Sequence, residues 1–213
     1  MKVLVIGANG QVGKHIVRQL TESEHDPVAM VRDTNQVPQF EDMGAKTVLA
    51  DLENDFSHAF YGCDAVIFAA GSGPHTGADK TILIDQEGAI KSIDYAKQFG
   101  VKHFVMLGSM GSDAPEKGPD SMKFYLYAKR RADEYLKTSG LNYTIIRPGA
   151  LTNTEPDGKV DLRENVGDRT GRSIPRADVA RVLVESVGKH NVRGKTLELL
   201  EGEKDIGKAV ESV

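Results

Sequence analysis

The chain has little of what several classes of protein require. Its 213 residues include a single cysteine, Cys63, which excludes an internal disulfide and which we interpret as a small buried apolar residue. No segment approaches the roughly 18 consecutive apolar residues of a membrane-spanning helix. The net charge is −4, so the basic excess of a nucleic-acid-binding surface is missing. We therefore expect neither a nucleic acid nor a membrane among the partners.

The histidines and the start of the chain show no signal for a metal or for targeting. The six histidines show no spacing typical of metal ligands. The first predicted strand begins almost at Met1, so we expect no signal peptide. We therefore expect no bound metal and a cytoplasmic location. The length suits one domain over residues 1–213 with a sizeable core.

Apolar segments rich in β-branched residues alternate with helical segments along the chain, which is typical of an α/β protein. The predicted strands cover residues 2–6, 27–31, 46–50, 63–71, 101–107, 141–146 and 195–200. The predicted helices cover residues 14–20, 34–43, 55–60, 78–99, 121–139 and 173–188. We predict a doubly wound parallel sheet with helices on both faces.

The C-terminal part predicts a small portion on the substrate side of such a sheet. Residues 150–174 form a polar region there, in which we expect a loop with a short hairpin over 151–173. Residues 201–213 are expected to form a loop and a weak terminal helix.

Glycines at a spacing of three follow the first predicted strand and open the first helix. Gly7 permits a sharp exit from the strand, Gly10 lets the backbone approach a pyrophosphate, and Gly13 lets the helix pack close to the strand. The helix would direct its unpaired N–H groups at that pyrophosphate. The alternative is a purely structural turn. The residues assigned to a dinucleotide here are Gly7, Asn9, Gly10, Gln11, Val12 and Gly13.

The end of the second strand bears on which dinucleotide binds. Arg32 comes directly at the strand end, where a guanidinium would pair with the 2′-phosphate of NADP. Asp33 follows it and could instead accept hydrogen bonds from both ribose hydroxyls of NAD. A solvated arginine is the third reading. We favour NADP over NAD.

Further strand ends complete the predicted cofactor site. Asp51 is placed to accept the exocyclic amine of adenine or to cap a helix over 55–60, and Leu52 can pack against the ring. The strand over 63–71 ends in small residues that leave room for a ribose, and a loop over 71–77 would line or cover the site. The remaining residues assigned to the cofactor are Ala69, Ala70, Gly71, Lys129, Pro148 and Gly149.

Two residues on one helical face carry the predicted chemistry. Tyr125 and Lys129 are four residues apart, so both can point at one site, where an ammonium stabilises a phenolate. Tyr125 would then exchange a proton with a carbonyl or hydroxyl oxygen, and Ser109 at a strand end could hold the same oxygen. Tyr127 lies on another face and is interpreted as a packing residue. The alternative is a solvated helix face.

These motifs together resemble the atypical short-chain dehydrogenase/reductases, in the bacterial NAD(P)-dependent epimerase/dehydratase group, with kinship to NmrA-like proteins. The resemblance spans nearly the whole chain and implies a Rossmann sheet with bound NADP. In the wider superfamily a Ser, a Tyr, a Lys and an Asn form the active site, which implies roles for Ser109, Tyr125 and Lys129. Asp85 stands where the superfamily has the asparagine, a change typical of the atypical group. The motifs are Gly7-x-x-Gly10-x-x-Gly13, Val31-Arg32-Asp33, Ala50-Asp51-Leu52, Ser109-Met110-Gly111, Tyr125-x-x-x-Lys129, Arg147-Pro148-Gly149 and Ile174-x-Arg176-x-Asp178-Val179-Ala180.

Two functions remain open on this basis. The first is an NADP-dependent oxidoreductase or epimerase/dehydratase-type enzyme, a monomer or homodimer, acting on a small carbonyl or hydroxyl compound such as a quinone or flavin. The second is a non-catalytic NADP(H)-binding sensor of NmrA type. The small C-terminal portion argues against a nucleotide-sugar substrate, because extended sugar-nucleotide epimerases use a much larger substrate domain.

Overall fold

The computed structural model describes all residues except 74 and 75, so part of the loop expected over 71–77 lies outside the described residues. Its strands are β1 (Lys2–Ile6), β2 (Asp26–Val31), β3 (Lys46–Leu49), β4 (Ala65–Phe68), β5 (His103–Leu107), β6 (Tyr143–Pro148), β7 (Ala150–Thr152), β8 (Lys159–Arg163), β9 (Ser173–Pro175), β10 (Lys195–Glu201) and β11 (Lys204–Asp205). Its α-helices are α1 (Gln11–Thr21), α2 (Val37–Glu41), α3 (Ala78–Lys80), α4 (Ala89–Gln98), α5 (Asp120–Thr138), α6 (Arg176–Ser186) and α7 (Ile206–Glu211). The shorter helical turns are η1 (Thr34–Gln36), η2 (Ser57–Phe60), the π-helical η3 (Thr81–Gly88) and η4 (Pro115–Lys117).

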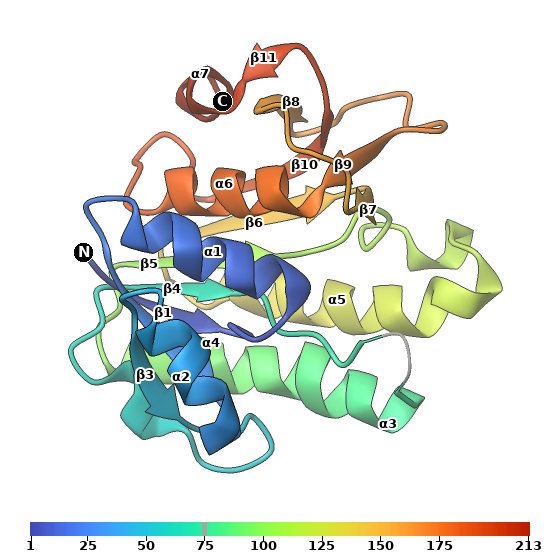
Figure 1. Ribbon diagram of the computed structural model, residues 1–213. Coiled ribbons are helices and arrows are strands. Elements are labelled where there is room, and N and C mark those ends of the chain that lie inside the picture. The colour runs from blue at the N-terminus through green and yellow to red at the C-terminus, as the bar shows by residue number, and fades with distance from the viewer. Residues whose placement is uncertain (74–75) are drawn as a thin grey trace.

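A nine-stranded sheet, in the order β11-β8-β10-β6-β5-β4-β1-β2-β3, runs through the described residues (Figure 1). From β3 to β10 neighbouring strands are parallel, while β8 pairs antiparallel with β10 and β11 with β8. The strand order reverses at β1, which pairs with β2 on one side and β4 on the other. In such sheets a crevice opens at the carboxyl ends of the strands at this reversal, which places the candidate site.

Helices cover both faces of the sheet. On one face, Val3 and Val5 pack in a buried cluster with residues of α1, α2, α6 and α7. On the other, Leu4 and Ile6 pack with residues of η2, α4 and α5. Both faces of the central strands are therefore apolar, as a parallel sheet requires, and the predicted doubly wound fold is confirmed.

Some predicted elements differ in detail. The helix expected over 34–43 is divided into η1 and α2, and the helix expected over 78–99 contains the π-helical η3. The hairpin expected within 151–173 is wrong, because β7 pairs in parallel with β9 and β8 joins the main sheet beside β10. Within the described part of the chain, no helix is both long enough and apolar enough to cross a membrane.

Candidate cofactor and active site

The turn between β1 and α1 is tightly packed at its glycines. Gly7 has a φ of +87°, and a Cβ on it would lie 2.5 Å from the backbone nitrogen of Ala70. A Cβ on Gly13 would overlap the carbonyl oxygen of Gly7, so the start of α1 can approach β1 only without a side chain there. The backbone N–H of Gly10 donates to that same carbonyl at 3.0 Å. The turn is therefore a compact cradle formed by backbone.

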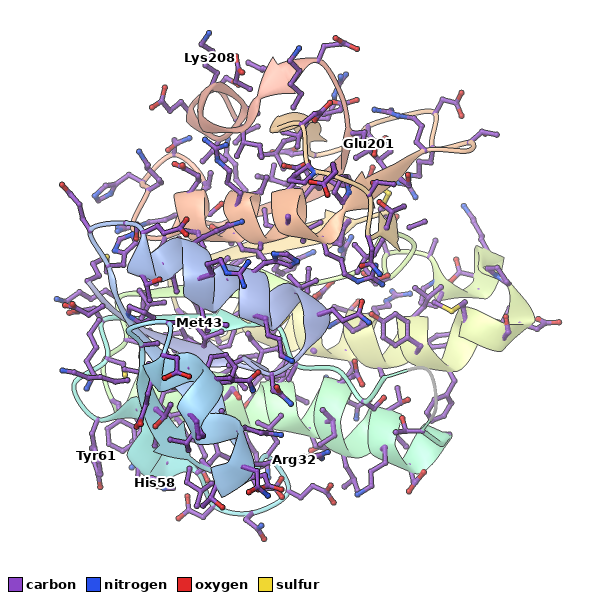
Figure 2. The ribbon with its side chains drawn as sticks, viewed as in Figure 1. Arg32, Met43, His58, Tyr61, Glu201 and Lys208 are labelled. Atoms are coloured by element: carbon purple, nitrogen blue, oxygen red, sulfur yellow. The ribbon has the colours of Figure 1, made fainter. Side chains whose placement is uncertain are left out.

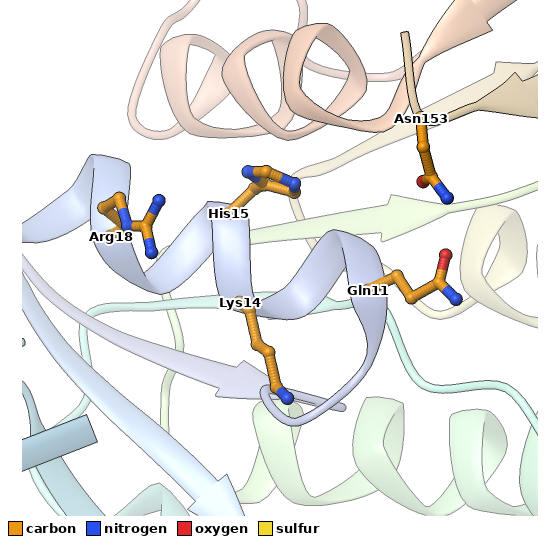
Figure 3. Close-up of a pocket in the computed structure, with 5 residues that line it drawn as sticks. All are labelled: Gln11, Lys14, His15, Arg18 and Asn153. Carbon is orange, nitrogen blue, oxygen red and sulfur yellow. The ribbon is translucent and has the colours of Figure 1, made fainter. Parts of the chain in front are cut away.

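The N-terminus of α1 provides donors to this cradle. Gly10 occupies the N-cap position, and in the described structure no side chain caps the helix. The first N–H groups of the helix are thus left for a ligand, which suits a pyrophosphate. Val12 is buried, whereas Gln11 is exposed and lines a hollow on the flank of α1 (Figure 3). The side chain of Asn9 is engaged elsewhere, since its Oδ1 accepts a hydrogen bond from Gln39 Nε2 at 2.8 Å.

The end of β2 separates the roles of two adjacent charged residues. Asp33 Oδ1 accepts a hydrogen bond from the backbone N–H of Asn35 at 2.9 Å and so caps η1. Arg32 is exposed beside α2 (Figure 2), and its guanidinium makes no hydrogen bond or ion pair with any described residue. Because the Asp33 carboxylate is engaged in this cap, it is less available to a ribose. The neighbouring Arg32 guanidinium is available to a phosphate.

Asp51 and Leu52 follow β3 in a turn. Asp51 Oδ1 accepts a hydrogen bond from the backbone N–H of Glu53 at 3.0 Å, which stabilises this turn. The alternative in which Asp51 caps the next helix is wrong, because η2 begins only at Ser57, whose N–H donates to Asp55. Leu52 is buried, and its Cδ1 lies close to Gly88, where a Cβ would come within 3.2 Å.

The end of β4 lies against the glycine turn and is held there by Asp85. Ala69 and Ala70 are half-buried, and their backbone approaches Gly7. Asp85 is 1% exposed, and its Oδ2 accepts a hydrogen bond from the backbone N–H of Ser72 at 2.9 Å. Asp85 lies in η3, and π-helical turns of this kind occur often at functional sites. It therefore supports the wall of the crevice formed by residues 69–72.

Lys129 reaches from α5 to the end of β5. Although it is only 2% exposed, its Nζ donates a hydrogen bond to the carbonyl oxygen of Leu107 at 2.7 Å. Ser109 comes two residues later, half-buried, with its Oγ donating to the Met110 carbonyl at 3.3 Å. Tyr125 is half-buried one helical turn before Lys129, and its hydroxyl makes no hydrogen bond among the described residues. Ser109 and the Lys129 ammonium thus both lie at the carboxyl end of β5. Asp85 and Lys129 form no ion pair within 4 Å among the described residues.

The end of β6 is tied to the loop that carries Ser109. The N–H of Met110 donates to the carbonyl of Pro148 at 3.0 Å, and the N–H of Gly149 donates to that of Leu199 at 3.1 Å. A Cβ on Gly149 would overlap the Leu200 side chain. Pro148 and Gly149 therefore occupy a fixed position beside the end of β5.

A buried ionic network, which sequence reasoning missed, supports the same edge. Arg147 Nη2 lies 2.9 Å from Asp133 Oδ2, and its Nε donates to the same oxygen at 3.0 Å. Ser112 Oγ also donates to this oxygen at 3.1 Å. The network joins β6, α5 and the loop after β5. In the sequence Arg147 stands out only as part of the Arg147-Pro148-Gly149 motif, and nothing in the charged sequence around Asp133 indicates that this residue is 0% exposed.

Comparison with known proteins agrees with this geometry. A family model described as NAD(P)H-binding matches residues 7–190. The chain is 40% identical to "Uncharacterized sugar epimerase YhfK" of Bacillus subtilis, with 100% of both chains covered. It is similar to a solved structure from Bacillus halodurans described as a "Putative NAD-dependent epimerase/dehydratase", at 52% identity and a TM-score of 0.98 over 100% of both chains. The oxidoreductase ylbE from Lactococcus lactis matches at 33% identity and a TM-score of 0.88, over 100% of this chain and 96% of that one. The resemblance inferred from the motifs is thereby confirmed, and the chain belongs to the NAD(P)H-binding family, with oxidoreductase- and epimerase-like relatives.

Proposed function

We propose that the protein is an NADP-dependent oxidoreductase that acts on a small carbonyl or hydroxyl compound such as a quinone or flavin, with residues 1–213 serving as one nucleotide-binding unit. The observation that carries the proposal is the buried Lys129 ammonium at the carboxyl end of β5. Burying a lysine is costly unless it has partners. The Lys129 ammonium donates to the carbonyl of Leu107, two residues before Ser109, and Lys129 lies one helical turn after Tyr125. A solvated helix face, the alternative for these residues, does not explain that burial.

The cofactor would be held by backbone on one side and by strand-end residues on the other. The pyrophosphate fits the uncapped N-terminus of α1, and the ribose beside it fits the small residues at 69–71. The adenosine end would lie between Asp51, Leu52 and Arg32. When bound, NADPH would supply a hydride to the substrate carbon.

Preference for NADP is supported by how the two charged residues after β2 are used. The Asp33 carboxylate is engaged in capping η1, whereas the Arg32 guanidinium has no partner among the described residues. A guanidinium forms charge-assisted, bidentate hydrogen bonds with a phosphate, so Arg32 is suited to the 2′-phosphate that distinguishes NADP from NAD.

Tyr125, Lys129 and Ser109 would manage the proton. Reduction of a carbonyl adds a hydride to carbon and a proton to oxygen, and the Tyr125 hydroxyl would donate that proton. Lys129 donates one N–H to the carbonyl of Leu107. Its two other N–H groups would stabilise the Tyr125 oxygen and anchor the nicotinamide ribose. Ser109 Oγ would turn from the Met110 carbonyl to donate to the substrate oxygen.

Asp85 would hold the crevice wall in place, because its carboxylate accepts a hydrogen bond from the N–H of Ser72.

The region after β6 is small, which supports a small substrate in place of a sugar nucleotide. Two similar proteins are described as epimerase-type and one as an oxidoreductase. Epimerisation at a hydroxyl-bearing carbon through a transient carbonyl would use the same residues, with Tyr125 accepting the hydroxyl proton in the first step.

The test is a turnover assay with NADPH and a panel of carbonyl compounds, quinones and flavins. Tyr125→Phe should lower turnover by about 10²- to 10⁴-fold while leaving NADPH affinity nearly unchanged, since it removes only the proton donor. Tyr127→Phe is the matched control. The interpretation of Tyr127 as a packing residue is wrong, because it is 50% exposed on another face of α5, so turnover of this variant should equal that of the wild type. NADPH binding without turnover on any substrate would contradict the proposal and favour an NADP(H) sensor.

A further inference from the structure

A hollow lies on the flank of α1, outside the crevice at the strand ends. Its first part, of about 350 Å³, is lined by Gln11, Lys14, His15, Arg18 and Asn153. A second part, of about 270 Å³, shares His15 and Asn153 with the first and continues over residues 152–156 to Arg176 at the start of α6. Together they form one groove, which we name the α1–α6 groove. Its size is within the range of sites that bind small molecules.

Positive charge exceeds negative charge among the residues that line this groove. Lys14, Arg18 and Arg176 all line it, and none of them forms an ion pair with a described residue. Glu155 is the only carboxylate among the described lining residues, and it pairs with none of them. The chain as a whole carries a net charge of −4, so the groove is a local exception. Like charges gathered around one hollow repel each other, and an anion bound between them would relieve that repulsion.

Hydrogen-bonding groups from both walls are directed into the groove. The side chains of Gln11 and His15 extend from α1 toward Asn153, while Arg18 lies one turn further along α1 (Figure 3). Arg176 Nη1 donates to Asn153 Oδ1 at 2.9 Å, which holds the two residues together on the opposite wall. Burial, and then the nearby Arg18, lower the pKa of His15, so its ring is neutral near pH 7 and can still donate one hydrogen bond.

The groove adjoins the cofactor cradle but is distinct from it. Gln11 is the first residue of α1 and borders both, whereas His15 and Arg18 lie one and two turns further along the helix. A pyrophosphate in the cradle would face the N-terminal N–H groups, and the groove would remain open on the flank of the same helix.

We propose that the α1–α6 groove binds an anionic small molecule, through phosphate or carboxylate groups, at the same time as the cofactor occupies the glycine turn. Arg18 and Arg176 provide charge-assisted hydrogen bonds from the two walls, and His15 and Asn153 contribute neutral ones between them. The anion is either a free ligand or an anionic arm of the substrate.

The binding test uses protein saturated with NADP, so that the cradle is filled. Inorganic phosphate and citrate are titrated separately by calorimetry, and the ring signals of His15 are followed by NMR. At least one probe should bind and shift the His15 signals. Arg18→Ala and Arg176→Ala should each weaken that binding about tenfold, with NADP affinity unchanged. The control is Lys97→Ala, which removes an exposed cation of α4 far from the groove and should change nothing.

The outcomes separate this proposal from the proposed function, because binding is measured without turnover. Absence of binding by both probes, loss of binding on saturation with NADP, or binding unchanged in both arginine variants would each overturn the proposal. In the turnover assay, a probe that competes with the substrate identifies the groove as the place of an anionic substrate arm. A probe that changes turnover without competing, or that binds with no effect on it, identifies a free ligand.

Discussion

Arg147 is a charged residue held almost entirely out of water, and its position depends on Asp133. Their side chains are 8% and 0% exposed, and Asp133 Oδ2 takes two contacts from the guanidinium and one from Ser112. Removing one partner of a buried pair leaves the other charge uncompensated, which costs more than the pair contributes.

We therefore expect Asp133→Asn to lower the free energy of unfolding by about 3–5 kcal/mol, measured by urea denaturation. Glu134→Gln is the matched control one residue away, because Glu134 pairs with Arg130 on the helix surface with 52% of its side chain exposed. That exposed pair should contribute less than about 0.5 kcal/mol. If Asp133→Asn lowered the free energy of unfolding by no more than the small loss expected for Glu134→Gln, the buried network would not stabilise the fold.

His103 gives the fold a predictable dependence on pH. Its ring is 0% exposed, and Nδ1 accepts a hydrogen bond from the N–H of Gly188 at 3.0 Å, so the proton is on Nε2, 3.0 Å from Thr144 Oγ1. Burial, and then the charge of Arg193, lower the pKa of His103 from 6.5 to about 4. The unfolded chain therefore binds a proton between pH 6.5 and 4 that the folded protein does not.

The contribution of His103 to stability is complete above pH 6.5 and is lost as the pH falls toward 4. The free energy of unfolding should fall by on the order of 3 kcal/mol across this interval from this residue alone. Denaturation of the wild type and of His103→Gln at several pH values measures this. A slope below pH 6.5 that is the same in both proteins would assign the dependence to other groups.

At the scale of elements, the contact between β1 and α1 depends on Gly13. A Cβ there would overlap the carbonyl of Gly7, so Gly13→Ala must push α1 away from the strand and should destabilise the protein by about 1–3 kcal/mol or more. It should also weaken NADPH binding, since the helix N-terminus would move. Thermal denaturation and a binding titration report these two effects.

Gly207→Ala is the control for Gly13→Ala, because Gly207 lies in helix α7 and a Cβ on it would meet nothing within 4 Å. Alanine has the higher helix propensity, so this variant should be neutral or slightly stabilising, within about 1 kcal/mol. If Gly13→Ala behaved in the same way, the close approach of α1 to β1 would not be required.

Elements were predictable where one signal determined them. The glycine turn after an apolar strand is sufficient for β1 and α1, since few other structures suit that pattern. The π-helical η3 was not predictable, because the apolar spacing over 78–99 suits a regular α-helix and nothing in the local sequence marks the extra residue of a π-helical turn. Asp133 was missed for a related reason. It lies among lysines and arginines, and only the fold brings Arg147 to it.

At the scale of the whole molecule, the alternation of strands and helices limits the sheet to few topologies, which is why its parallel part and the crevice were predictable. The pairing of β8 with β10 was not. β8 alternates polar and apolar residues within a polar region, and its partner lies far along the chain, so no local pattern indicates the contact. The candidate cofactor site lies at the parallel part of the sheet, which the sequence predicts. The α1–α6 groove is formed where α6 and the segment after β7 pack beside α1, and no local pattern indicates this contact.

In the proposed function this crevice binds NADP through Arg32. Titrations of NADPH and NADH into the wild type, Arg32→Ala and Arg131→Ala test this contact. Arg131 is the control because it is an exposed arginine of another element, α5. The wild type and the control should prefer NADPH, and Arg32→Ala should lose about 10- to 100-fold in NADPH affinity, with little change for NADH, because it loses a charge-assisted contact with the 2′-phosphate. Equal affinity of the wild type for both dinucleotides, or equal losses for both in Arg32→Ala, would contradict the claim.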